Sequence, residues 1–176
     1  MRWNDLFADL EGQLSAAAAA QFNAEVSELT RAERASVEFG ARAVATVGGS
    51  VTVTMRDGEH VAGTLADASP QWLLVTQGVR QHLIPLEAVS FIGGLSTQAA
   101  PLSEVDRRLS VGHAYRALSV DRARVVVHTD ATALAGVIGA VGADHVDVAT
   151  SLGNQARVTV PFAAIIQVRS ADGASD

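Results

Sequence analysis

Apolar side chains recur at steps of three and four along residues 3–34, and this spacing is typical of one face of an amphipathic helix. An alanine run at 16–20 adds the strongest helix former, whereas Gly12 weakens the pattern. We therefore predict a helix from residue 3 to about 34. Its apolar stripe consists of Trp3, Leu6, Phe7, Leu10, Leu14, Ala18, Phe22, Val26 and Leu29.

After residue 35 the pattern changes to short β-branched segments, and the same succession of segments occurs twice. The aligned stretches are 35–44 with 109–118, 51–75 with 125–149, and 82–92 with 158–168. Matched positions include Ser36 with Ser110, Val37 with Val111, Arg42 with Arg116, Gly63 with Gly136, and Pro85 with Pro161. This internal repeat predicts two copies of one small folded unit.

Each copy has the pattern of a short helix followed by five strands. In the first copy, Asp57-Gly58 predicts a tight hairpin after the first strand. A glycine inside the second strand, Gly63 or Gly136, marks a bend or a close backbone approach, and Pro85 or Pro161 ends the fourth strand. Such bends favour the curling of a short sheet into a barrel. The predicted strands are Val51–Met55, Val61–Asp67, Trp72–Thr76, a fourth ending at Pro85, and Val89–Ile92, then Val125–Thr129, Leu134–Val141, His145–Ala149, a fourth ending at Pro161, and Ile165–Val168.

The predicted fold is mainly β with α: a long N-terminal helix followed by two tandem, five-stranded, antiparallel small β-barrels. The expected parts are an amphipathic helix at 1–34, a first barrel at 35–93, a linker at 94–104, a second barrel at 105–170 and a disordered tail at 171–176.

Composition narrows the class of protein. The 176 residues include no cysteine, which excludes disulfides and thiolate zinc sites, and the formal charge is −6. Acidic residues stand where a secretory signal needs an apolar core, and no apolar run reaches the ~20 residues that span a bilayer. We expect a cytoplasmic protein without a membrane partner.

The predicted helix is too long to bury its whole stripe on a barrel of about 60 residues, so part of the stripe should contact another copy of the chain or a protein partner. Acidic residues exceed basic ones along 1–38, which argues against docking on nucleic acid or an anionic membrane. We expect an oligomerisation or packing helix. Its contact residues would be Trp3, Phe7, Leu10, Leu14 and Phe22.

The segment MRDGEHVAGTLADASPQWLLV resembles the first motif of the Sm-like family of small β-barrels, with its nearest likeness to the bacterial Hfq type. LIPLEAVSFI is similar to the family's fourth and fifth strands. The resemblance covers about 35–93 and 109–170. It implies rings in which neighbouring barrels pair their edge strands, with RNA bound at the pore and on the ring faces.

The family's RNA-binding residues do not carry over with the fold. Its Lys-His pair would fall at Leu86-Glu87 in the first copy and at Phe162-Ala163 in the second. Its acidic residue after the second strand would fall at Ser69 and Gly142. Leucine and glutamate in place of two donors remove an attraction for phosphate and add a repulsion. The resemblance therefore implies the fold without the uridine pocket.

No constellation identifies a reaction or a metal site. The five histidines lack metal-ligand spacing, and in Asp144-His145-x-Asp147 the first two residues should face opposite sides of a strand. The glycines lack the strand–loop–helix context of a phosphate cradle. We predict no catalytic residue, no metal and no cofactor.

The densest basic segment flanks the start of the second copy and offers the best site for an anionic partner. It contains Arg107, Arg108, Arg116, Arg122 and Arg124, with Tyr115 available to stack on a base. The alternative is an exposed helix face balanced by Glu104, Asp106 and Asp121.

Two functions follow from these patterns. The first is a non-catalytic Sm-like assembly or adaptor protein. Its copies would form either a three-chain pseudo-hexamer, with the linker allowing edge pairing within the chain, or a dimer through the N-terminal helix. The alternative is an RNA-binding post-transcriptional regulator that uses the arginine segment in place of the lost pocket.

Overall fold

A computed structural model describes residues 3–150 and 156–171, without the side chains of 3–14, 33 and 34. The chain divides into two compact units, Met1–Val37 and Glu38–Asp176. The predicted tail at 171–176 lies outside the described residues except for Ala171, which is not free: its N–H donates to the carbonyl oxygen of Arg124 at 3.0 Å.

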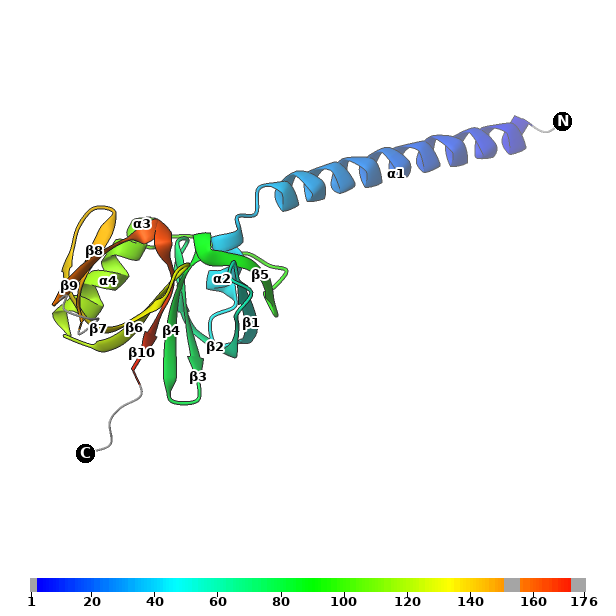
Figure 1. Ribbon diagram of the computed structural model, residues 1–176. Helices are drawn as coiled ribbons and strands as arrows, with labels where there is room; N and C mark the ends of the chain where they lie inside the picture. Colours follow the sequence, from blue (N-terminus) through cyan, green and yellow to red (C-terminus); the bar gives the residue numbers. More distant parts are fainter. Residues whose placement is uncertain (1–2, 151–155, 172–176) are drawn as a thin grey trace. The chain divides into compact units, whose positions relative to one another are not determined.

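The first unit is a single long helix, α1 (Trp3–Ala35, Figure 1). It confirms the helix predicted for residues 3 to about 34. Of the predicted contact residues, Phe22 is exposed, and the stripe continues with exposed Val26 and Leu29. The side chains of Trp3, Phe7, Leu10 and Leu14 lie outside the described residues.

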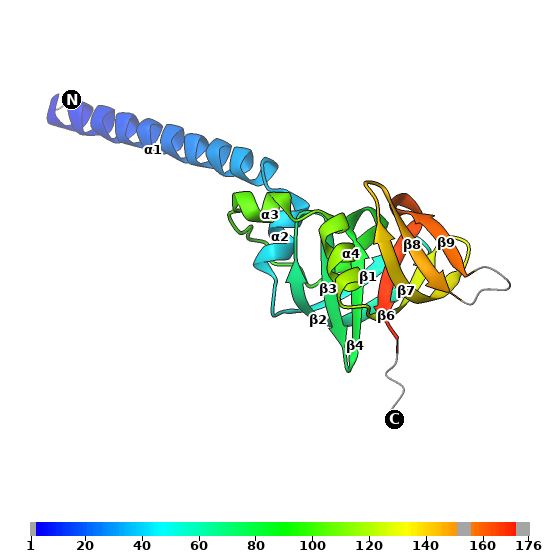
Figure 2. The same ribbon diagram turned by 90° about the vertical axis from the view of Figure 1, so that its left-hand side faces the viewer.

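The second unit contains a ten-stranded antiparallel sheet with the strand order β5-β1-β2-β3-β4-β10-β6-β7-β8-β9 (Figures 1 and 2). The strands are β1 (Ser50–Met55), β2 (His60–Ala68), β3 (Trp72–Gln77), β4 (Arg80–Pro85), β5 (Val89–Gly93), β6 (Arg124–Thr129), β7 (Ala133–Val141), β8 (His145–Thr150), β9 (Arg157–Pro161) and β10 (Ile165–Ser170). Every predicted strand is present, with ends that differ by at most two residues.

The two repeats have the same topology. Strands β1–β5 form repeat 1 and β6–β10 form repeat 2, each in the order fifth, first, second, third, fourth. The registers also match, because Val51 lies opposite Gly63 and Val125 lies opposite Gly136. Both fifth strands have an irregularity after their first residue, next to Ser90 and Ile166 respectively. The duplication seen in the sequence is therefore a duplication of structure.

The sheet is open, and this differs from the expected pair of closed barrels. In each repeat the fourth and fifth strands stand at opposite ends of the strand order and do not pair with each other. Instead, β4 of repeat 1 pairs antiparallel with β10 of repeat 2. This is the edge pairing within one chain that we expected the linker to allow, and it joins the repeats into one sheet.

Each hydrophobic core includes side chains from the other repeat. The core of repeat 1 is built mainly from β1–β4 and also contains Ile166 of β10, which is fully buried. The core of repeat 2 likewise contains Trp72 of β3 and Leu83 of β4. Because neither core is complete without the other repeat, we expect residues 38–171 to unfold cooperatively.

The glycines and prolines singled out in the sequence have the predicted roles. A Cβ atom at Gly63 or Gly136 would overlap a carbonyl oxygen of the neighbouring strand. Gly58 has a φ of 88° in the β1–β2 turn, a conformation that glycine adopts without strain. Pro85 and Pro161 end β4 and β9, and each is followed by one turn of 3-10 helix, η1 (Leu86–Ala88) and η2 (Phe162–Ala164).

Short helices precede each set of strands: α2 (Phe39–Ala45) before β1, and α3 (Glu104–Arg108) and α4 (Val111–Val120) before β6. The linker is tied to α2, because the Ala100 N–H donates to Ala41 O at 3.0 Å and Arg42 Nε donates to Ser96 O at 2.7 Å. A capping box formed by Ser103 and Asp106 begins α3. These bonds fix the path from repeat 1 to repeat 2.

Candidate functional site

The contact between β4 and β10, called the junction below, is the feature that distinguishes this sheet from two separate units. Leu83 lies opposite Val168, and His82 lies opposite Arg169. The Gln81 N–H also donates to Ser170 Oγ at 3.0 Å. With so short a ladder, side chains must supply much of the stability of the junction.

One face of the junction is polar. His82 Nδ1 lies 2.8 Å from Gln167 Oε1, and both side chains are almost fully buried, at 4% and 3% exposure. Since Gln167 Oε1 is an acceptor, the ring N–H at His82 Nδ1 is the donor of this bond. A hydrogen bond in such a buried place holds the two strands in one register, because a shift would leave both groups unpaired.

His128 of β6 and Arg169 of β10 lie beside this pair. Within the described residues, His82 Nε2, His128 Nε2 and Arg169 Nε are buried without a hydrogen-bond partner. Burial lowers the pKa of His128, and the positive charge of Arg169 lowers it further, while Glu59 and Asp57 act in the opposite direction. The polar face therefore favours neutral His128.

An ion pair connects the two repeats at their first turns. Arg56 Nε and Nη2 donate to the two carboxylate oxygens of Asp130 at 3.0 and 3.1 Å. The Nη2 atom also donates to the carbonyl oxygen of Ala163 at 2.7 Å. A guanidinium that grips a carboxylate with two bonds fixes orientation as well as distance. Arg56 and Asp130 occupy matching positions in the sequence repeat.

The two end strands, β5 and β9, each pair with one neighbouring strand among residues 3–150 and 156–171. They are the repeat counterparts of the strands at the junction: β5 matches β10, and β9 matches β4. The difference in burial is large, because Gln167 of β10 is 3% exposed whereas its counterpart Phe91 of β5 is 66% exposed. An exposed aromatic side chain on a free edge is a feature of surfaces that pair with another chain.

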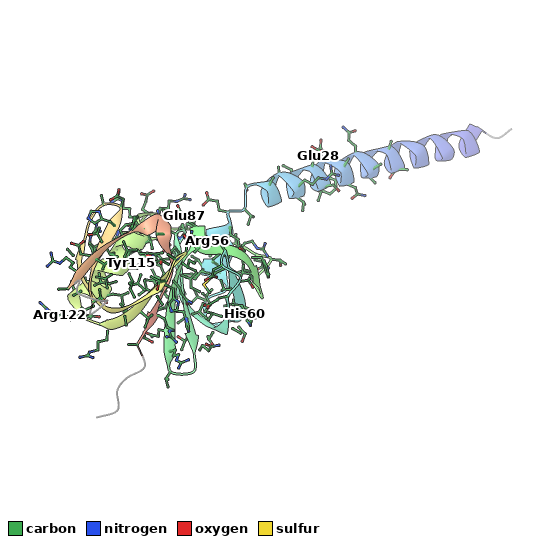
Figure 3. The ribbon with its side chains drawn as sticks, in the orientation of Figure 1. Glu28, Arg56, His60, Glu87, Tyr115 and Arg122 are labelled. Atoms are coloured by element: carbon green, nitrogen blue, oxygen red, sulfur yellow. The ribbon has the colours of Figure 1, made fainter. Side chains whose placement is uncertain are left out.

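The predicted arginine surface is divided. Arg107 and Arg108 lie on α3, Arg116 lies on α4, and Arg122 and Arg124 lie beyond the far end of α4, where Figure 3 labels Arg122. The ten residues of α4 span about 15 Å, so the first two and the last two are well separated. All five are exposed, and Arg108 lies 3.9 Å from Glu104. RNA binding by these residues stays a prediction.

Tyr115 is not available to stack on a base, so that part of the prediction is wrong. Its side chain is fully buried under α4, and its ring packs against Phe162 with centroids 5.1 Å apart. The hydroxyl has no hydrogen-bond partner among the described residues. Burial, together with the nearby carboxylate of Glu87, raises the pKa of Tyr115 (Figure 3).

Two shallow grooves occupy matching places in the repeats, one beside Gly63 and one beside Gly136, with volumes of about 680 and 440 Å³. Among the described residues that line them, Arg124 is the one with an ionisable side chain. Asp144, just before β8, contacts His145 Nδ1 at 2.9 Å rather than facing away from it.

Within the described parts of the chain, no three metal-ligating side chains gather, and no helix has the length and apolar character to cross a membrane.

His82, Gln167, Arg56 and Phe91 were not predicted as site residues. A signal for His82, Gln167 and Phe91 was present in the repeat alignment, where polar His82 and Gln167 lie over apolar Val158 and Phe91. A polar residue at a strand position that is apolar in the other copy indicates that the two copies have different neighbours.

Comparison with known proteins adds no family: no family model matches the sequence, and no curated protein is significantly similar to it.

Proposed function

We propose that this chain is a non-catalytic, Sm-like assembly protein whose copies associate when β9 of one copy pairs with β5 of the next. One observation carries the proposal: the strands left free at the two ends of the sheet are the repeat counterparts of the strands that pair at the junction. The strand pairing that joins the two repeats within the chain can therefore form a second time, between β9 of one chain and β5 of another.

The junction supplies the register of the proposed contact. Leu83 opposite Val168 becomes Thr159 opposite Ile92 of the next copy, and His82 opposite Arg169 becomes Val158 opposite Gly93. The pairing would satisfy the free backbone groups of both edges and cover Phe91.

The same repetition brings opposite charges together at the turns. Within the chain Arg56 binds Asp130, and these residues hold matching positions. In the contact between chains, Asp130 of one copy would therefore face Arg56 of the next. Arginine and aspartate would alternate along the assembly, so each turn would have an oppositely charged neighbour on both sides.

A contact between two different edges is head-to-tail, and it continues until the assembly closes into a ring or extends as a filament. Three chains contribute six repeats, the arrangement that the Sm-like resemblance implies. Each copy also carries one α1 with exposed Phe22, Val26 and Leu29. A ring would present several such helices together, which gives multivalent binding to a protein partner and suits an adaptor; helix-to-helix contact between copies is compatible with the same stripe.

Phe91→Glu tests the proposal. Glutamate at an exposed edge position leaves the fold of one chain intact but places a charge in the proposed contact. We expect light scattering of the unmodified protein to give a multiple of the 18.2 kDa chain mass, and the variant to shift toward 18.2 kDa on dilution.

Val79→Glu is the matched control, because Val79 is 96% exposed in the β3–β4 turn and belongs to neither free edge. This variant should keep the mass of the unmodified protein. The proposal fails if the unmodified protein is a stable monomer, or if Phe91→Glu and Val79→Glu have the same mass.

A further inference from the structure

The junction within the chain and the proposed contact between chains differ in chemistry. At the junction, His82 of β4 binds Gln167 of β10, and both are buried. Their counterparts at the free edges are Val158 of β9 and Phe91 of β5. At these two matching positions, the junction has a hydrogen-bonded polar pair, His82 and Gln167. The proposed contact between chains has an apolar pair, Val158 and Phe91.

We infer that these two pairs determine which edge recognises which: His82 and Gln167 specify the pairing of β4 with β10 inside the chain, and Val158 and Phe91 specify the pairing of β9 with β5 of a second copy. This inference rests on the proposed self-association and adds its specificity. It assigns the partner of the exposed edge as a second copy of the same chain, met through a valine and a phenylalanine.

The wrong pairings are unfavourable for a definite reason. If β10 paired with β9, Gln167 would be buried against Val158 and its side-chain amide would lose the bond to His82. If β5 paired with β4, Phe91 would cover His82 and remove its acceptor. Each mismatch buries an unpaired polar group, which costs more than the original hydrogen bond contributes. Specificity thus comes from penalties on the wrong partner as well as from the right contact.

The residue that lies opposite His82 also differs between the junction and the free edge. Arg169 lies opposite His82 at the junction, and its counterpart in β5 is Gly93. A glycine there removes both the charge and the side chain that Val158 would otherwise meet. β5, the edge proposed to pair with another copy, therefore lacks the arginine that β10 presents at the junction.

A rescue experiment tests this specificity. Phe91→Gln and Val158→His each create one mismatch, and each should raise the dissociation constant for self-association about tenfold, since 1.4 kcal/mol corresponds to that factor. Phe91→Gln with Val158→His recreates the hydrogen-bonded pair of the junction. We expect this double variant to associate with nearly the constant of the unmodified protein, measured by sedimentation equilibrium.

Val79→Gln with Val158→His is the control double variant, and it should remain as weak as Val158→His alone. If Val158→His does not fold, Val158→Asn replaces it, because the asparagine amide also offers an N–H to the glutamine oxygen. Additive weakening in the double variant would overturn the inference while leaving the proposed function in place. Failure of Phe91→Glu to change the mass would instead overturn the proposed function.

Discussion

Gly136→Ala is expected to lower the free energy of unfolding by about 3 kcal/mol, because the added methyl group has no space in β7. A Cβ at this position would overlap the carbonyl oxygen of Ala149 and lie 3.0 Å from Val148 Cγ1. The carbonyl belongs to the paired strand β8, so relief requires the two strands to move apart. Urea denaturation followed by circular dichroism measures the loss.

Gly139→Ala is the matched control in the same strand. A Cβ there would meet nothing closer than the carbonyl oxygen of Asp147 at 3.6 Å, an ordinary contact. It should leave the unfolding midpoint nearly unchanged. Equal midpoints for Gly136→Ala and Gly139→Ala would contradict the close approach of β7 and β8 at Gly136. Gly63→Ala should behave as Gly136→Ala, since a Cβ at Gly63 would overlap Thr76 O.

Ile166→Ala is expected to lower the free energy of unfolding by about 2–5 kcal/mol, the range for removing a large aliphatic side chain from a core. Ile166 is fully buried in the core of repeat 1 although it belongs to β10 of repeat 2. The loss should therefore destabilise both repeats together. Denaturation monitored by tryptophan fluorescence and by circular dichroism should give one coincident transition.

Ser90→Ala is the comparison, because Ser90 is the exposed repeat counterpart of Ile166. It should change stability by a few tenths of a kcal/mol at most, as surface substitutions do. Two separate transitions in Ile166→Ala would mean that the repeats fold independently, and a loss below about 1 kcal/mol would mean that Ile166 does not fill a core position.

The repeat alignment predicted the strands because local features determine them. β-Branched runs and the bends at Gly63 and Gly136 act over a few residues and recur in the same order in both copies, and the turn at Gly58 adds a local signal in the first copy. Pro85 and Pro161 predicted where the fourth strands end but not the 3-10 turns that follow them. The signals that occur in both copies made the prediction stronger than one copy would have.

Closure of the sheet could not be predicted in the same way. A curved five-stranded unit has the same alternation of apolar and polar residues whether its edges meet each other or meet another unit. The choice depends on side chains distant in sequence, such as Ile166 in the core of repeat 1 and Arg56 bound to Asp130. The length of the linker was compatible with edge pairing within the chain, but the sequence did not identify the residues that stabilise the pairing of β4 with β10.

The burial of Tyr115 follows from the spacing of apolar residues along α4. Val111, Tyr115 and Leu118 recur at steps of four and three, so they form one face of α4, and all three belong to or pack against the core of repeat 2. The arginines at 107, 108, 116, 122 and 124 fall outside this face and are exposed. Charge alone indicated exposure correctly, but the aromatic residue followed the apolar face.

Cross-linking through single cysteines can detect the pairing of β9 with β5 of a second copy, since the chain contains no cysteine of its own. In the proposed contact, Ile92 of one copy lies opposite Thr159 of the next, at a separation that a disulfide can bridge. A mixture of Ile92→Cys and Thr159→Cys chains should form a disulfide-linked heterodimer under mild oxidation, and a mixture of Val79→Cys and Thr159→Cys chains should not. Equal cross-linking in the two mixtures, or none in the first, would contradict association through β5 and β9.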